Sequence, residues 1–141
     1  MIKKFSLIII TFALFGAFLY GYMVLQYKEK KINEVANIQY GDITKIVFFD
    51  GRGNNPPITL EDKQKITEFE QLLDRCKLKK EKLHDHSKEW IYRADFYKGD
   101  NQLTSITFSN LLQIDGRFYN IVEGDLSPDT IHHFLKSANL D

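Results

Sequence analysis

The residues that come closest to a chemical site are two histidines on either side of an aspartate: His84, Asp85 and His86. On an extended segment the two histidines would project to the same side, where two imidazoles can share a metal ion. His132 and His133 could add ligands if the last helix lies near this segment. Two ligands alone make an incomplete site, and the segment is rich in charge, which is typical of a surface loop. We therefore expect no bound metal and retain His84 and His86 as the metal candidates.

The same histidines are the basis of an alternative function, in which the protein is a sensor or an enzyme rather than a binding module. Histidine titrates near neutrality, so a metal- or pH-responsive sensor, or a small enzyme, would use the His84-Asp85-His86 region. An enzyme needs a nucleophile beside a base, or carboxylates paired in a pocket. In this chain no serine or histidine lies in a recognisable motif, and the acidic residues are scattered. The sequence predicts no catalytic residue and no cofactor, and we expect the protein not to be an enzyme.

A long turn over residues 50–57 is the second candidate region. Its sequence, DGRGNNPP, consists of residue types that favour turns. It lacks the Gly-Lys-Ser/Thr of a phosphate-binding loop and the alternating acids of a calcium-binding EF-hand. Because loops often carry recognition, we expect contacts with a partner at Arg52, Asn54 and Asn55, and at the histidine pair of the later loop.

A run of basic residues lies between these two regions. It consists of Arg75, Lys77, Lys79, Lys80 and Lys82. Such a run is usually a solvated surface. The alternative is electrostatic contact with an anionic lipid or a wall polymer, which would weaken as salt is added.

The segment that organises the chain is apolar, begins at Phe5 and ends at Tyr27. It contains no charged residue, and as a helix it would span about 34 Å, enough for a hydrocarbon core of about 30 Å. Lys3 and Lys4 precede it, and tyrosines gather towards its other end, where amphipathic rings favour the membrane interface. The segment therefore predicts a single membrane-spanning helix.

A cleaved signal peptide is the alternative to an anchor. The apolar run is longer than the usual signal core of about 7–15 residues, and no Ala-x-Ala precedes a polar stretch, so we expect an uncleaved signal anchor. A bare count of the flanking lysines slightly favours a cytoplasmic domain. Long domains translocate largely regardless of charge, however, and a short basic N-terminus is the usual arrangement for export. We expect a single-pass protein of the cell membrane with its C-terminal domain outside the cytoplasm.

The composition of the remaining chain limits its partners. Residues 28–141 carry nineteen acidic and seventeen basic residues (nineteen less Lys3 and Lys4), a net charge of −2 with neutral histidines. A nucleic-acid binder normally shows a basic excess, so we expect no nucleic-acid partner. Cys76 is the only cysteine, which excludes an intramolecular disulfide but does not identify the compartment.

Periodicity and turn signals predict the secondary structure. Apolar residues at spacings of three and four indicate a helix over residues 62–77, with Cys76 on its buried face. Asp115-Gly116 is the strongest hairpin signal, and a two-residue turn there would place Leu112 opposite Tyr119. We expect strands over residues 43–49, 58–60, 89–97, 103–109, 111–114 and 117–122, a charged connector over 77–88, and a closing helix that begins at Ser127-Pro128 and ends near Ser137.

This order predicts an α+β fold: an N-terminal transmembrane helix, then a mainly antiparallel sheet with two helices packed on one face. We divide the chain into a signal anchor (residues 1–27), a juxtamembrane linker (28–42) and an extracytoplasmic domain (43–141). In the linker, apolar residues at helical spacing would let the anchor helix continue for two turns, and the segment as a whole would be a solvated spacer.

The layout resembles that of small surface-attached proteins of Gram-positive bacteria, most of which have no assigned function. The resemblance covers most of residues 42–135 and rests on the lysine-started anchor, the Gly/Asn turn, the "ITLED" that opens a helix, and the "IDGRFY" hairpin. It implies membrane attachment and transfers no catalytic residue. We expect a binding or accessory module that contacts a protein or a cell-surface polymer through the open sheet face and the loops.

Overall fold

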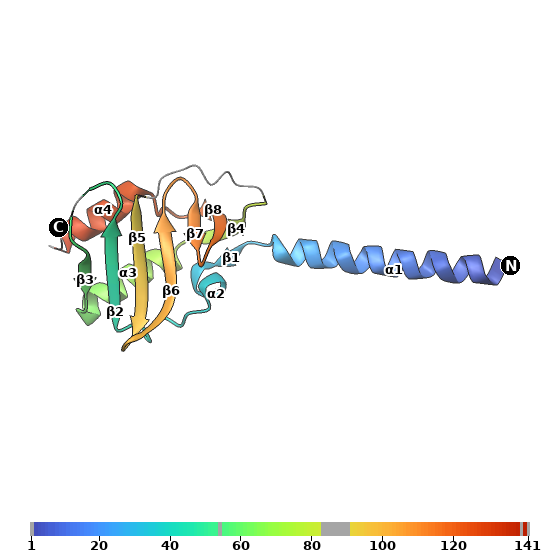
Figure 1. Ribbon diagram of the computed structural model, residues 1–141, viewed down its shortest axis with the longest axis horizontal. Helices are drawn as coiled ribbons and strands as arrows, with labels where there is room; N and C mark the ends of the chain where they lie inside the picture. Colours follow the sequence, from blue (N-terminus) through green and yellow to red (C-terminus); the bar gives the residue numbers. More distant parts are fainter. Residues whose placement is uncertain (1, 54, 83–90, 139, 141) are drawn as a thin grey trace.

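The computed structural model describes residues 2–53, 55–82, 91–138 and 140. It consists of a long N-terminal helix followed by an α+β domain, as the sequence predicted (Figure 1). The helices are α1 (Ile2–Gln26), α2 (Ile32–Ala36), α3 (Lys63–Asp74) and α4 (Pro128–Ser137). The strands are β1 (Lys30–Lys31), β2 (Lys45–Asp50), β3 (Ile58–Leu60), β4 (Lys77–Lys80), β5 (Tyr92–Lys98), β6 (Asn101–Phe108), β7 (Leu112–Ile114) and β8 (Arg117–Glu123).

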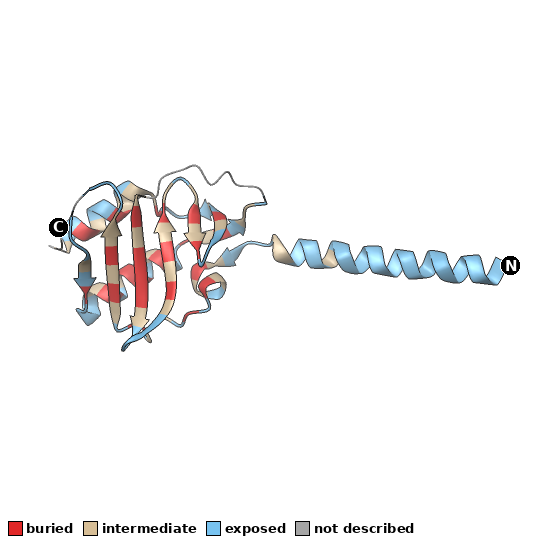
Figure 2. Cartoon of the chain, in the orientation of Figure 1, coloured by how far each residue is buried: buried red, intermediate tan, exposed pale blue. Residues whose placement is uncertain are grey.

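Helix α1 extends away from the domain, and none of its residues is buried (Figures 1 and 2). It is 25 residues long, and among the described residues it is the one helix long and apolar enough to cross a membrane. Large apolar side chains surround it on all sides, for example Phe12, which is 73% exposed, and Phe18, also 73% exposed. An isolated apolar surface of this kind is unfavourable in water and favourable in lipid.

The domain is built on one eight-stranded antiparallel sheet with the strand order β1-β4-β8-β7-β6-β5-β2-β3. The predicted hairpin is confirmed, since Leu112 pairs with Tyr119. Asp115 and Gly116 at its turn have φ angles of 47° and 84°, as a type I′ turn requires. The Asp115 carboxylate also accepts hydrogen bonds from the Thr104 hydroxyl (2.9 Å) and the Ser105 amide (3.1 Å), which ties this turn to β6.

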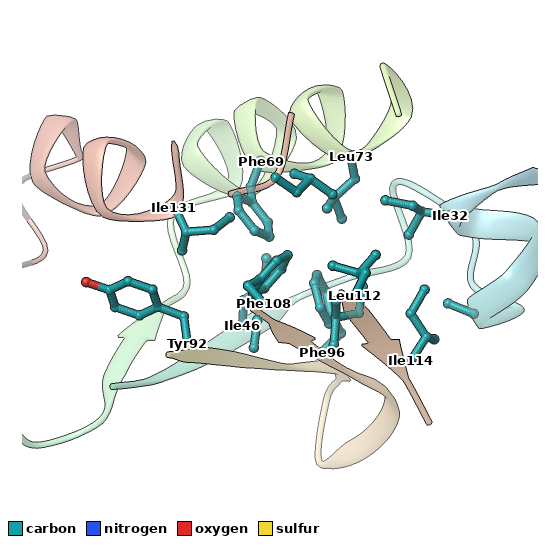
Figure 3. Packing of buried hydrophobic residues seen from close by; sticks show 14 of the residues in the cluster. Ile32, Ile46, Phe69, Leu73, Tyr92, Phe96, Phe108, Leu112, Ile114 and Ile131 are labelled. Carbon is teal, nitrogen blue, oxygen red and sulfur yellow. The ribbon is translucent and has the colours of Figure 1, made fainter. Parts of the chain in front are cut away.

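Helices α3 and α4 pack on one face of the sheet, and Phe69 of α3 lies at the centre of the core between them (Figure 3). Its ring centroid is 5.2 Å from that of Phe48 on β2 and 4.8 Å from that of Phe134 on α4. Both helices begin at capping side chains, because Asp62 accepts from the Lys65 amide and Ser127 from the Thr130 amide.

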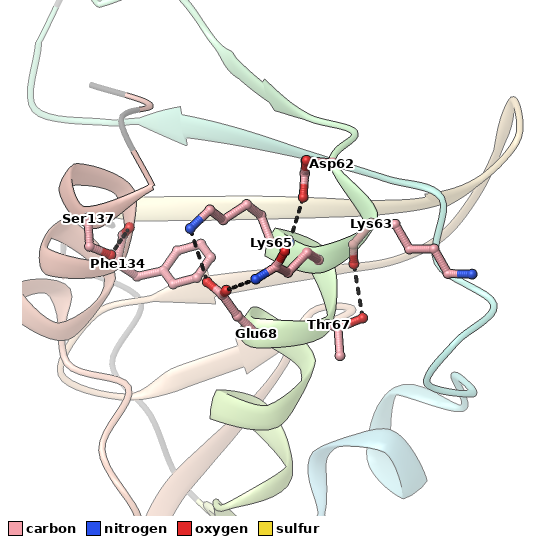
Figure 4. Close-up of polar contacts among 8 residues, drawn as sticks. Asp62, Lys63, Lys65, Thr67, Glu68, Phe134 and Ser137 are labelled. Atoms are coloured by element: carbon pink, nitrogen blue, oxygen red, sulfur yellow. Dashed lines mark hydrogen bonds and ion pairs between the residues drawn. The ribbon is translucent and has the colours of Figure 1, made fainter.

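The outer surface of α3 is polar and bonds mainly within itself (Figure 4). Lys65 donates to Glu68 over 3.3 Å, and the Thr67 hydroxyl donates to the Lys63 carbonyl over 2.9 Å. A side-chain pair such as Lys65 and Glu68, at i,i+3 or i,i+4, stabilises a solvated helix face by a few tenths of a kcal/mol, roughly 0.2–0.5. The apolar face of α3 therefore determines where this helix packs.

Two sequence-based expectations were wrong. Residues 77–80 do not belong to a connector but form β4, which pairs with β8 and with β1, so α3 ends at Asp74 rather than at Lys77. Residues 28–42 are not a solvated spacer, because α1 ends at Gln26 and β1 and α2 join the domain. Ile32 is fully buried in the core, and the energy of burying this side chain explains why the segment folds back onto the sheet.

Candidate functional site

A pocket of about 480 Å³ lies between the β2–β3 turn, the start of β5 and helix α4. Sheet pairing forms it, since Asp50 at the end of β2 lies directly opposite Tyr92 at the start of β5. Figure 3 shows Tyr92 at the margin of the core, with its hydroxyl directed away from the other labelled side chains. The pocket therefore lies where the apolar core meets a polar turn.

One wall of the pocket is apolar. It is formed by Phe48, Pro57, Ile58, Leu135 and Leu140. The two prolines of the turn restrict the backbone that carries this wall, because each fixes its own φ angle. A ligand with an aliphatic or aromatic group would be desolvated against these side chains.

Arg52 forms the polar side of the pocket and is held in place at two points. Its Nε lies 3.3 Å from Asp50 Oδ1, and the same carboxylate oxygen accepts the Arg52 backbone amide over 2.9 Å. Its Nη2 donates to the Tyr92 hydroxyl, and its guanidinium carbon lies 4.8 Å from the centre of the Tyr92 ring. Half of the Arg52 side-chain surface remains exposed, at 50%.

His132 extends this chain of contacts onto α4. Its Nδ1 lies 3.1 Å from the Tyr92 hydroxyl. Because that hydroxyl accepts from Arg52, its own proton is available for His132 Nδ1, and we assign the remaining imidazole proton to Nε2. The hydrogen bonds then run from Arg52 to Tyr92 and from Tyr92 to His132. Asp50 holds the guanidinium from its other side.

The protonation states of the charged and polar groups in the pocket suit binding rather than catalysis. Burial acts to raise the pKa of Asp50, but hydrogen bonds from Arg52 and its positive charge outweigh burial and hold that pKa below its ordinary value. The Asp50 hydrogen bond raises the pKa of Arg52 further, so the guanidinium stays charged. Burial raises the pKa of Tyr92, which opposes formation of a phenolate even though a histidine lies beside it.

The remaining donors define what the pocket can bind. In the part of the chain that the structure describes, Arg52 Nη1 has no hydrogen-bond partner, and neither has His132 Nε2. Both are N–H donors at the edge of an apolar wall. A carboxylate, phosphate or carbonyl next to an apolar group fits this combination, since charge-assisted bonds to guanidinium are among the stronger hydrogen bonds in proteins.

The structure places some of the predicted contact residues here and leaves others undescribed. Arg52 and Asn55 both line the pocket. Asn54 and the His84-Asp85-His86 segment lie outside the described residues. Across the described ranges, no group of three or more His, Cys, Asp or Glu side chains is placed to hold a metal ion.

Sequence reasoning missed Tyr92 and His132 as site residues. Tyr92 falls within the strand predicted over residues 89–97, but nothing local shows that its hydroxyl reaches the turn at Arg52. His132 was considered only as an added metal ligand. A signal did exist for His132, because it precedes the buried Leu135 by one helical turn and so lies on the pocket side of α4.

The sheet face opposite the helices is occupied by a polar network. Arg93 lies over the Phe49 ring at 4.3 Å and pairs with Asp95 at 3.3 Å. Asp95 in turn accepts from the Ser105 hydroxyl over 2.7 Å. These groups already bond to one another on this face of the sheet.

Comparisons of the chain with protein-family models, with curated proteins and with solved structures gave no match.

Proposed function

We propose that this chain is a single-pass membrane protein whose C-terminal domain is a binding or accessory module outside the cytoplasm, and that the Arg52 pocket is its recognition site. The partner is a protein or a cell-surface polymer that presents an anionic or carbonyl group beside an apolar one. The observation that carries the proposal is the held guanidinium of Arg52, with free N–H groups at the edge of an apolar wall.

The anchoring part of the proposal is supported by α1. None of its residues is buried, and its large apolar side chains are exposed. Lys3 and Lys4 lie in its first turn, ahead of the apolar residues, which is the usual arrangement for a helix that directs export of the domain attached to its C-terminal end. The resemblance to surface-attached proteins of Gram-positive bacteria is consistent with this orientation.

The binding role is favoured over catalysis by the state of the polar groups. Asp50 is engaged with Arg52, and burial keeps Tyr92 protonated, so the pocket has fixed donors but no activated nucleophile among these groups. Fixed donors lose little conformational freedom when a partner binds, which is how preorganised sites gain affinity.

The test is site-specific photo-crosslinking in the cells that make the protein. A photoreactive side chain replaces Asn55, which lines the pocket and is exposed. The matched control replaces Asn101, an exposed residue that begins β6 beside the other end of β5. We expect one specific adduct from position 55 and none from position 101, and its yield should fall about five-fold or more with Arg52→Gln.

Two results would contradict this function. One is an adduct yield at position 55 that is the same with and without Arg52→Gln. The other is the same set of adducts from positions 55 and 101, which would indicate contact by proximity to the membrane rather than by the pocket.

A further inference from the structure

A second cavity, of about 480 Å³, lies where α1 meets the domain. We call it the anchor groove. Tyr22 and Leu25 near the end of α1 line one part of it, and residues of β1, α2, β4 and β8 line the rest. It is distinct from the Arg52 pocket, since the two share no lining residue.

Chain connectivity fixes the groove close to the end of the apolar helix. Only residues 27–29 separate α1 from β1, so Gln26 and Lys30 can be at most about 14 Å apart even with the chain extended. β1 pairs with β4, and β4 with β8, so this edge of the sheet is the part of the domain nearest to α1 (Figure 1). If α1 spans a membrane, the groove faces the headgroups of the leaflet on the side of the domain.

The groove collects positive charge that the protein does not neutralise. Lys28, Lys30, Lys80 and Arg117 line it, and Glu34 is the only acidic residue in the lining. None of the four basic side chains has an ion-pair partner among the residues that the structure describes. Four cations facing one carboxylate favour an anionic ligand.

Two neighbouring lysines on this edge of the sheet do form ion pairs with carboxylates. Lys31 lies 3.1 Å from Asp74, and Lys77 lies 2.8 Å from Glu123. The charges of these two neighbouring lysines are therefore paired, whereas, within the described part of the chain, those of the four basic side chains in the groove are not.

The other half of the groove is apolar and lies at the depth of the interface between the membrane and water. Tyr22 and Leu25 of α1 face Val35, Leu78 and Tyr119 of the domain. Tyrosine near the end of a membrane helix lies where the headgroups meet the acyl chains. A ligand that fills the groove needs a phosphate on the domain side and apolar atoms on the helix side.

We infer that the anchor groove binds an anionic phospholipid, with the headgroup phosphate held by Lys28, Lys30, Lys80 and Arg117 and the glycerol and upper acyl carbons against Tyr22 and Leu25. This inference rests on the membrane anchoring in the proposed function. It gives Lys80, one residue of the basic run, a specific ligand and would fix the orientation of the domain on the membrane surface.

The test uses the full chain with α1 intact, purified in detergent, and native mass spectrometry with added phosphatidylglycerol or phosphatidylcholine. We expect one phosphatidylglycerol to bind per chain, about ten-fold or more tightly than phosphatidylcholine. Lys80→Gln with Arg117→Gln should abolish this preference. Lys63→Gln with Lys136→Gln, the same change in charge at exposed positions outside the groove lining, should retain it.

Thermal unfolding of each variant checks that the domain folds. If the variant with Lys80→Gln and Arg117→Gln does not fold, Lys28→Gln with Lys30→Gln, just before and at the start of β1, replaces it. An unchanged lipid preference in the folded groove variants would overturn the inference. So would full displacement of the lipid by excess inorganic phosphate, which would indicate a site for free anions. Alkaline carbonate extraction of membranes separates the two proposals: release of the protein contradicts anchoring, whereas retention without lipid preference contradicts only the groove.

Discussion

Arg52 shows how single residues determine what the pocket can bind. The turn that carries it is long and rich in glycine, so a lone arginine there would sample many conformations. Contacts with Asp50 on one side and with Tyr92 on the other restrict it. The positive charge is thereby held at the pocket edge before any partner arrives.

The Asp50 contact predicts a specific pH dependence of stability. The folded protein lowers the pKa of Asp50 below its unfolded value of about 3.9, so this group stabilises the fold above that value and loses its contribution as the pH falls through the folded pKa. Asp50→Asn should therefore lower the urea midpoint at pH 7, with the difference from the unmodified protein shrinking towards pH 3.

The control for this prediction is Asp100→Asn, at an exposed position in the β5–β6 turn, which should leave the midpoint nearly unchanged at both pH values. A constant difference between Asp50→Asn and the unmodified protein from pH 7 to pH 3 would contradict the role of the ionised carboxylate.

At the level of elements, the connection between β8 and α4 depends on the absence of a side chain at Gly124. Its φ angle is 88°, and a Cβ atom there would lie 2.5 Å from Cys76 Sγ and 3.1 Å from the Arg75 carbonyl oxygen. Both are atoms of the link between α3 and β4, so two connections of the fold cross at this point.

Gly124→Ala should therefore destabilise the domain more than Gly99→Ala does. Gly99 also has a positive φ, 61°, but a Cβ there would meet no atom within 4 Å. Backbone strain alone costs about 1–2 kcal/mol at either position, and the overlap at Gly124 should add about 1–3 kcal/mol. Urea unfolding of the two variants measures the difference, and equal losses would contradict the close packing at Cys76.

Element-level patterns also explain which parts of the fold could be predicted. Strand β5 and the Asp115-Gly116 hairpin have local signals, in alternation and in turn chemistry, and both were predicted. Strand β4 has the sequence KLKK, with one buried residue, Leu78, so its lysines suggested a connector. Its strand conformation comes from pairing with β8 and β1, which no local pattern reveals.

The same distinction applies to the candidate site. Arg52 and Asn55 lie in a turn that composition identifies, so they could be proposed from the sequence. Tyr92 and His132 reach the pocket only because the register of β2 against β5, and the packing of α4 on the sheet, bring distant segments together. Long-range pairing of this kind decides which residues meet, and it is not encoded in any single segment.

At the scale of the whole molecule, the chain joins an exposed apolar helix to a domain on which the anchor groove and the Arg52 pocket lie apart. The anchor groove lies at the edge next to α1, whereas the Arg52 pocket is built from β2, β5 and α4. Since β1 and β3 are the two outer strands of the sheet, the strands nearest each cavity lie towards opposite edges. A domain held at the membrane by one edge would leave the other available to a partner.

The most direct test of this account is the topology of the anchored chain, probed at Ser137→Cys in a Cys76→Ala background. Ser137 is exposed near the end of α4, whereas Cys76 is 1% exposed and burial raises its thiol pKa. We expect an impermeant thiol reagent to label Ser137→Cys in intact cells, and the labelled protein to remain in the membrane after carbonate extraction. Labelling only after lysis would contradict a domain outside the cytoplasm, and release of the protein into the soluble fraction would contradict the anchor.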